Sequence, residues 1–250
     1  MAGHSKWANI KHRKGRQDAV KGAMFTKLGR EIIVAARTGG GNPEANFRLK
    51  IAIAKAKAVN IPNENIKRAI EKGVGGTDGA NYEELTYEGY GPGGTAVMVR
   101  AMTDNRNRTA GEIRHIFSKN GGNMGESGCV SWMFKEKGIL TIEREGCKHS
   151  VDDLMLMALE FGAEDLAEGE DIEIITEPDT FQAVKEGLEG EGVVFSDSEV
   201  TMIPETSVVV TDLEQAKFVL RMMESLEDHD DVQNTFTNFD VPDEIAEQLG

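Results

Sequence analysis

A glycine-rich segment from Gly73 to Leu85 divides the chain into two parts with different hydrophobic patterns. Before it, apolar residues recur at three- and four-residue intervals, which is typical of amphipathic helices. After it, short apolar runs alternate with helical patterns, which is typical of sheets covered by helices. The segment itself has little to bury and is predicted to be a linker. In a chain of 250 residues, domains of about 100–150 residues allow two domains or three small ones.

Three helices, each with one apolar face, are predicted before the linker. The first begins at Asp18 and ends at the glycines 39–41. The second follows the capping pair Asn42 and Pro43 and buries four residues, Phe47, Ile51, Ala54 and Ala58. The third is capped by Asn63 and ended by Gly73. Because short helices with single apolar stripes are stable only when packed together, we expect a small bundle behind a polar N-terminal arm.

Beyond the linker, the pattern predicts one domain interrupted by another. The first part of this domain reads ββαβ: a hairpin around the turn at 91–94, a helix with the capping box Thr109 and Glu112, and a strand at 130–134. The last helix and strand of the chain add αβ. Residues 138–203 between them read βαβαβ. The predicted fold class is α+β multidomain, with an all-α bundle and two α+β domains with antiparallel sheets, the third inserted in the second. The expected boundaries are 1–80, 81–134 plus 205–240, and 135–204.

Basic and acidic residues are distributed unevenly along the chain. The whole sequence has 28 basic and 43 acidic residues and a net charge of −15. Up to Lys72 there are 16 basic and 5 acidic residues, a local net charge of +11, so the remainder carries −26. Such an asymmetry indicates a basic binding module attached to acidic domains. The acidic runs 160–173 and 224–231 are expected to be solvated surfaces, without a calcium-binding pattern.

The basic module is the strongest functional signal, because clustered cations on an arm and on helix faces bind the repeating phosphates of nucleic acid. A solvated basic surface is the alternative interpretation. The predicted nucleic-acid-binding residues are Lys6, Trp7, Lys11, His12, Arg13, Lys14, Arg16, Lys21, Lys27, Arg30, Arg48, Lys50, Lys55, Lys57, Lys67, Arg68, Arg106 and Arg108.

Three of these residues have two interpretations of similar weight. Trp7 either stacks on a base or pins the arm to the bundle. Arg106 and Arg108 precede a predicted helix N-terminus, where the helix dipole disfavours cations. They either bind phosphate together with the free N–H groups of the helix or bond internally to Asp104 and to carbonyl groups.

The sequence contains no enzymatic constellation, and we predict neither catalytic residues, nor metal ligands, nor a cofactor. The five histidines lack the spacing of a zinc site, and His115 is expected on the surface. The residues 89–94 match GxGxxG, but a strand follows them instead of a helix, so a hairpin turn is the better interpretation. Cys129 and Cys147 are expected to be reduced thiols of a cytoplasmic protein. No apolar run is long enough to span a membrane.

Several motifs together resemble the YebC/PmpR family, which includes the mitochondrial translational activator of cytochrome oxidase. They are MAGHSKWANIKHRKGRQDAVKGAMFTKLGREI at the start, NFRLKIAIAKAKAVNIPNENIKRAIEKG, YEGYGPGG and TDNRNRT. The resemblance covers essentially the whole chain. It implies three domains, the first all-α and the third inserted in the second, and a probable DNA-binding transcriptional regulatory protein. It also implies an alternative, a ribosome-associated factor that helps synthesis through consecutive prolines.

Three functions from different classes therefore stay open. The chain is a DNA-binding transcriptional regulator, a translation factor that binds ribosomal or transfer RNA, or an adaptor that uses its acidic domains and no nucleic acid. A sequence-specific regulator offers a helix with base-reading Arg, Asn or Gln side chains, whereas the predicted second helix exposes mostly lysine, which suits contact with phosphates. No membrane and no small-molecule substrate is expected, and the oligomeric state is left open.

Overall fold

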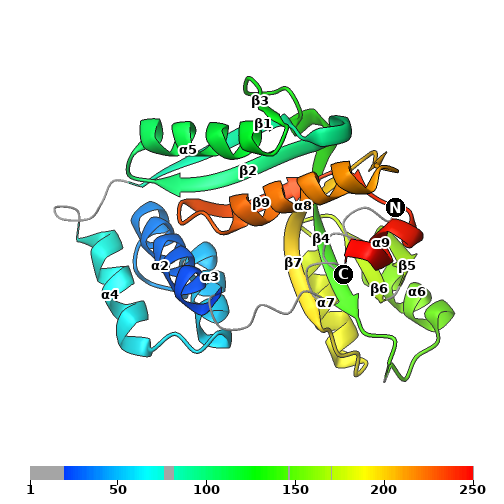
Figure 1. Ribbon diagram of the computed structural model, residues 1–250. Helices are drawn as coiled ribbons and strands as arrows, with labels where there is room; N and C mark the ends of the chain where they lie inside the picture. Colours follow the sequence, from blue (N-terminus) through cyan, green and yellow to red (C-terminus); the bar gives the residue numbers. More distant parts are fainter. Residues whose placement is uncertain (1–19, 76–81, 146, 170, 250) are drawn as a thin grey trace.

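The computed structural model describes residues 20–75, 82–145, 147–169 and 171–249 (Figure 1). The predicted arm and the expected helix start at Asp18 lie outside these residues. The described chain has the predicted fold class: a helical bundle, a second domain, and a third domain inserted in the second.

The N-terminal bundle consists of α2 (Val20–Gly39), α3 (Phe47–Ala58) and α4 (Asn63–Val74). Its core is formed mainly by small and branched side chains, among them Ile32, Ala36, Leu49, Ala52, Ala56 and Ile66. Gly73 does not end α4 as predicted. It lies inside the helix and is buried, and a Cβ added to it would approach the backbone oxygen of Ile33 to 2.6 Å. Glycine at this position therefore permits the close contact between α4 and α2.

The orientation of α3 differs from the prediction. The helix starts at Phe47, four residues later than expected, because Asn46 rather than Asn42 is its N-cap. The side-chain oxygen of Asn46 accepts a hydrogen bond from the Leu49 N–H at 3.1 Å, and its amide donates to the Ala35 oxygen at 2.8 Å. This buried cap turns the opposite face inward, so that the residues predicted to be buried are exposed: Phe47, Ile51, Ala54 and Ala58.

The second domain is an antiparallel sheet with helices packed against one face. Its sheet has the order β3-β1-β2-β9, from β1 (Glu83–Tyr90), β2 (Ala96–Thr103), β3 (Asn123–Met124) and β9 (Val232–Thr237). Alternate residues of β2 face two cores: Val97 and Val99 pack with the helices, whereas Ala96 and Met98 pack with Val130 and Phe134. The helices are α5 (Arg106–Lys119), α8 (Leu213–Glu227) and α9 (Asp243–Leu249), and the short parallel pair is β8 (Val208–Val209) with β10 (Phe239–Asp240).

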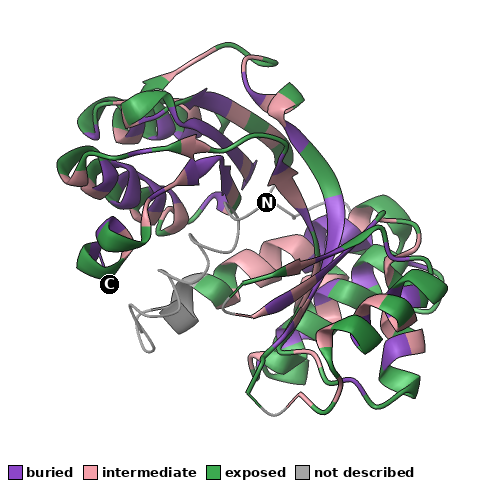
Figure 2. Ribbon diagram, turned by 90° about the vertical axis from the view of Figure 1, so that its right-hand side faces the viewer, coloured by how far each residue is buried: buried purple, intermediate pink, exposed green. Residues whose placement is uncertain are grey.

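The inserted domain runs βαββαβ and has the ferredoxin-like strand order β5-β6-β4-β7. Its elements are β4 (Phe134–Ile142), α6 (Val151–Glu160), β5 (Asp165–Glu168), β6 (Ile172–Thr176), α7 (Phe181–Gly190) and β7 (Asp197–Pro204). The predicted βαβαβ order was wrong because it missed the short strand β5. The predicted strand at 130–134 was wrong too, since residues Ser131–Met133 form a 3-10 turn. Figure 2 shows exposed outer faces of the helices over buried strands.

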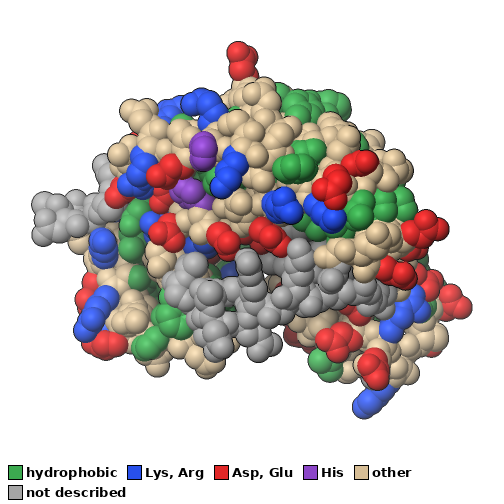
Figure 3. Space-filling model, in the orientation of Figure 1, with side chains coloured by type: hydrophobic (Ala, Val, Ile, Leu, Met, Phe, Trp, Pro, Cys, Tyr) green, Lys and Arg blue, Asp and Glu red, His purple; other side chains and the backbone are tan. Residues whose placement is uncertain are grey.

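The inserted domain joins the second domain through β4 and β7, which pair antiparallel from Phe134 opposite Pro204 to Thr141 opposite Asp197. The domain boundaries themselves stay a prediction. In Figure 3, acidic side chains predominate along the right-hand side, where Figure 1 places α9 of the second domain and α6 of the inserted domain.

Candidate nucleic-acid interface

Helix α3 gathers four of the predicted binding residues. Among the described helices it alone has basic residues and no acidic one. The cations Arg48, Lys50, Lys55 and Lys57 are all exposed. At 3.6 residues per turn, Arg48 and Lys55 lie on one side of the exposed apolar stripe, and Lys50 and Lys57 lie on the other. The two cations of each row, seven residues apart, are separated by about 10 Å along the helix.

Two of these cations have acidic neighbours in the described chain. Arg48 forms an ion pair with Glu84, and the Nζ of Lys50 lies 3.9 Å from a carboxylate oxygen of Glu44. For Lys55 and Lys57, the described residues provide no ion-pair partner. The exposed lysines of α3 are therefore available to an external anion.

Helix α4 adds Lys67 and Arg68, and both are exposed. The Nζ of Lys67 lies 4.0 Å from a carboxylate oxygen of Glu71 one turn later, which is a weak contact in water. Because α4 also carries Glu64, its positive charge is partly neutralised.

Two predicted binding residues on α2 have internal partners. Lys27 donates a hydrogen bond to the backbone oxygen of Glu227. The Nη1 of Arg30 lies 2.7 Å from a carboxylate oxygen of Asp231 and also bonds to the Asp230 backbone oxygen, and its guanidinium lies 5.4 Å from the Tyr82 ring centre. These contacts hold α2 against the second domain, so nucleic-acid contact by Lys27 and Arg30 stays a prediction.

Asp231 is the centre of this contact, although its acidic run was predicted to be solvated. Its side chain is only 3% exposed. One carboxylate oxygen accepts from Arg30, and the other accepts from Thr109 Oγ1 at 2.6 Å and from Arg108 Nη2 at 2.9 Å. Thr109 also bonds to Thr103 at 2.8 Å. We call these five residues, Arg30, Thr103, Arg108, Thr109 and Asp231, the Asp231 cluster.

The start of α5 explains why the prediction for this segment was partly wrong. Asn105 is the N-cap, and its side chain accepts from the Arg108 N–H at 3.1 Å, whereas Thr109 lies in the first turn and bonds to Asp231. Arg108 bonds internally to Asp104 at 3.1 Å as well as to Asp231. Arg106 is exposed. Of the two interpretations, the structure therefore places Arg108 in internal bonds and leaves Arg106 at the surface.

Burial raises the pKa of Asp231, but its bonds to Thr109 and Arg108 and the charge of Arg30 lower it by more, to about 2. An unfolded Asp has a pKa of about 3.9. The carboxylate therefore stabilises the fold above about pH 4, and this contribution is lost as the pH falls through about 2. We expect the stability difference between the wild type and Asp231→Asn to narrow by about 1 kcal/mol between about pH 5 and about pH 3, measured by urea unfolding. A constant difference would contradict this assignment.

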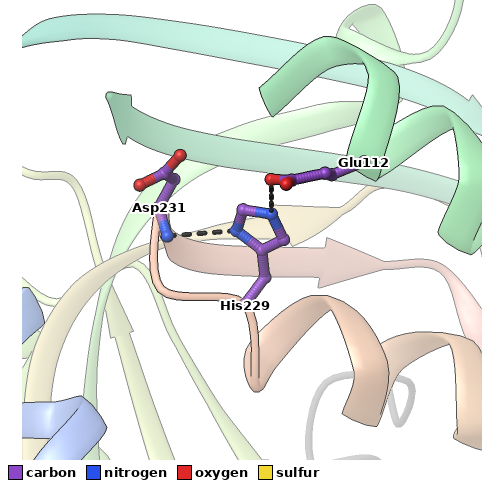
Figure 4. A group of neighbouring side chains, drawn as sticks. All are labelled: Glu112, His229 and Asp231. Carbon is purple, nitrogen blue, oxygen red and sulfur yellow. Dashed lines mark hydrogen bonds and ion pairs between the residues drawn. The ribbon is translucent and has the colours of Figure 1, made fainter. Parts of the chain in front are cut away.

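A possible metal-ligand set lies beside the cluster (Figure 4). The side-chain ligand atoms of Glu112, His229 and Asp231 lie within 4.8 Å of one another. However, His229 Nδ1 accepts from the Asp231 N–H at 3.1 Å, and Nε2 lies 2.9 Å from Glu112, so both ring nitrogens are engaged. The Asp231 carboxyl group points away from the imidazole toward its cationic partners. The geometry therefore supports a hydrogen-bonded contact and gives no support to a metal centre.

An ordered loop that sequence reasoning missed lies at the other end of the second domain. The buried Glu88 carboxylate accepts from the N–H groups of Gly128, Val130 and Ser131, each at 2.8 Å. The loop presents Trp132, which is 68% exposed, and the indole N–H of Trp132 donates to the Cys129 oxygen at 3.1 Å. The only sign of this loop in the sequence was Trp132, which lies in a run that was predicted to be a strand. Its exposure could not be predicted, because it depends on the Glu88 carboxylate far earlier in the chain.

The remaining predicted binding residues lie outside the described residues: Lys6, Trp7, Lys11, His12, Arg13, Lys14, Arg16 and the side chain of Lys21. The described cations thus form two separate groups, one on α3 and one in the Asp231 cluster. His115 is exposed as predicted, and Cys129 and Cys147 are free thiols.

Comparison with known proteins identifies the family. A model of the TACO1/YebC protein N-terminal domain matches residues 5–76, and a model of the TACO1/YebC second and third domain matches residues 82–239. The chain belongs to the TACO1/YebC family. Within this TACO1/YebC chain, the Asp231 cluster joins the two matched parts, since Arg30 lies in the first and Asp231 in the second.

Relatives of this TACO1/YebC chain match over nearly their whole length. A protein of Desulfitobacterium hafniense is 59% identical over 249 residues, 99% of each chain, and one of Moorella thermoacetica is 58% identical over 252 residues, 100% of this chain and 99% of the relative. Both are named "Probable transcriptional regulatory protein". The crystal structure of a conserved hypothetical protein from Aquifex aeolicus is 49% identical, covers 90% of this chain and 92% of its own, and has a TM-score of 0.80. In the part of the chain that the structure describes, no helix has the length and apolar character needed to cross a membrane.

Proposed function

We propose that this protein is a nucleic-acid-binding regulator of gene expression that holds phosphates with α3 and the basic N-terminal segment. The observation that carries the proposal is the exposed, acid-free set of cations on α3 in a chain whose net charge is −15. Clustered cations in an acidic protein suit a polyanionic ligand, because each phosphate contact releases condensed counterions. The names of the relatives support a role in transcription.

The side chains on α3 favour contact with the backbone of the nucleic acid. Three of the four cations are lysines, which act as point charges, and the one arginine is paired with Glu84. The helix has no Asn or Gln that would read base edges. This composition also favours a second candidate, a ribosome-associated translation factor that binds structured RNA. In either role the protein acts in the cytoplasm, without catalysis and without a cofactor.

Replacement of the three lysines of α3 tests the proposal. We expect Lys50→Gln, Lys55→Gln and Lys57→Gln together to reduce the slope of log affinity against log salt by up to about 2.7 for duplex DNA, since each phosphate contact contributes about 0.9. The measurement is a fluorescence titration of a labelled duplex at several salt concentrations. The matched control replaces Lys148, Lys185 and Lys217 by Gln, which changes the net charge equally outside the bundle.

An unchanged slope in the α3 variant, or an equal loss in the control, would overturn the assignment of phosphate contacts to α3. DNA and RNA are then separated by measuring ribosome co-sedimentation and promoter binding in parallel. Ribosome association that depends on the α3 lysines, with a promoter specificity ratio near one, would favour the translation factor.

A further inference from the structure

Helix α3 exposes apolar side chains that the binding of phosphates does not use. Phe47 is 66% exposed and Ile51 is 39% exposed. One turn from Ile51 in either direction lie two apolar and two basic residues, Phe47, Arg48, Ala54 and Lys55. We call the exposed residues Phe47, Arg48, Lys50, Ile51, Ala54, Lys55, Lys57 and Ala58 the α3 patch. A phosphate backbone needs the cations of this patch, but it does not cover the large apolar side chains between them.

Helix α6 of the inserted domain exposes the complementary pattern. Leu156 is 68% exposed and Leu159 is 48% exposed. One turn from Leu156 lie three acids, Asp152, Asp153 and Glu160, all of them exposed, and the helix has no basic residue. We call these five residues the α6 patch. Its negative charge excludes nucleic acid as a ligand and favours an apolar surface framed by cations.

We propose that the α6 patch of one copy of this protein binds the α3 patch of a second copy. Among the described helices, α3 is the one with basic and no acidic residues, and its cations flank an apolar stripe as the acids of α6 flank Leu156. Contact covers Phe47 and Ile51 with the two leucines and places Lys and Arg beside Asp and Glu. Both parts of the contact are favourable, because apolar area leaves water and opposite charges approach each other.

The two patches of one chain lie too far apart to meet each other, so the α6 patch meets an α3 patch only on a second copy. Figure 1 shows α3 in the bundle at one end of the molecule and α6 in the inserted domain at the other. The contact therefore joins different surfaces of two copies, so one copy can bind a neighbour at each end. With helices of 12 and 10 residues, the contact is about 15 Å long and lies at the small end of specific interfaces, which gives weak, reversible association.

Sedimentation velocity of the full chain, freed of nucleic acid, tests the proposal. In the wild type at low salt, we expect the mean sedimentation coefficient to rise with protein concentration up to about 1 mM, and this rise to weaken at about 1 M salt, where charges are screened beyond about 3 Å. Ile51→Glu and Leu156→Lys each weaken the association at least about tenfold, because each gives its patch a charge of the same sign as the charges on the partner patch. Both side chains are exposed, so circular dichroism and thermal unfolding should match the wild type.

Mixing the two variants gives the decisive result. The Ile51→Glu chain keeps an intact α6 patch and the Leu156→Lys chain keeps an intact α3 patch, so an equimolar mixture forms a dimer and nothing larger. The control Val194→Glu, at a residue that is 81% exposed elsewhere in the inserted domain, associates like the wild type. A wild type that stays monomeric, a Leu156→Lys chain that still associates, or a mixture that stays monomeric would each overturn the proposal. Leu156→Lys alters no predicted nucleic-acid contact, so a failure here is separate from a failure of the proposed function.

Discussion

Replacement of Asp231 by Ala is expected to destabilise the folded protein by about 3 kcal/mol, or to lower its melting temperature by roughly 10 °C. The substitution removes the carboxylate that accepts from Thr109, Arg108 and Arg30, and it leaves their donors without a buried acceptor. Breaking a buried ion pair at one partner costs about 3–5 kcal/mol, and the lower end applies because Arg108 is 44% exposed. Urea and thermal unfolding measure the effect.

The control for Asp231→Ala is Asp104→Ala, which removes another acidic partner of Arg108. Asp104 is exposed, so its ion pair contributes less than about 1 kcal/mol. The Asp231 substitution should also loosen the contact between the bundle and the second domain, because Arg30 on α2 loses its carboxylate partner. Faster proteolysis between the two parts in Asp231→Ala, but not in Asp104→Ala, is the expected result. Equal rates of proteolysis in the two variants would show that the cluster does not join the domains.

Replacement of Glu88 by Ala is expected to cost a similar amount, about 3 kcal/mol, and to disorder the loop that presents Trp132. Burial raises the pKa of Glu88, whereas the N–H groups of Gly128, Val130 and Ser131 lower it by more, so its net pKa lies below the usual value. Without the carboxylate, three backbone donors lose a charged acceptor. The opened loop lets water replace part of these bonds, and a net loss of two bonds at about 1.5 kcal/mol each gives the expected cost. Hydrogen exchange of these three amides should accelerate.

Glu136→Ala is the matched control, since Glu136 is an exposed acid whose contact with Arg100 is 3.5 Å long. Tryptophan fluorescence adds a second measurement, because the Trp132 indole loses its fixed bond to the Cys129 oxygen when the loop opens. A Glu88→Ala protein with unchanged exchange at Gly128, Val130 and Ser131 would contradict the assigned role of the carboxylate.

Helices and turns were predicted correctly where capping residues, glycines and a single apolar face occur close together in the sequence. The last predicted helix is α8, and Asp212 caps it by accepting from the Gln215 N–H at 2.7 Å. The hairpin around Pro92 was also predicted correctly, because the glycines of its turn fix the ends of the two strands. The fold class followed from the order of such elements.

The rest depended on contacts between distant residues. Helix α3 has apolar residues on two faces, and only the buried Asn46 cap, bonded to Ala35 on the previous helix, selects the face with Leu49. Asp231 looked like one acid in a solvated run, since its cationic partners Arg30 and Arg108 lie more than a hundred residues earlier. The charge of α3 was therefore predictable from the sequence, whereas the internal role of Arg30 and Arg108 was not.

The pairing of β4 with β7 brings the two ends of the inserted domain together. Phe134 and Pro204 are opposite each other in the ladder, so the points where the chain enters and leaves the inserted domain lie about 5 Å apart. For the second domain, the insertion therefore acts as a long loop whose two ends lie next to each other. The length of such a loop has little effect on stability, because doubling it costs only about 0.6 kcal/mol in chain entropy. We therefore expect the inserted domain to be exchangeable for a two-residue turn without unfolding its host.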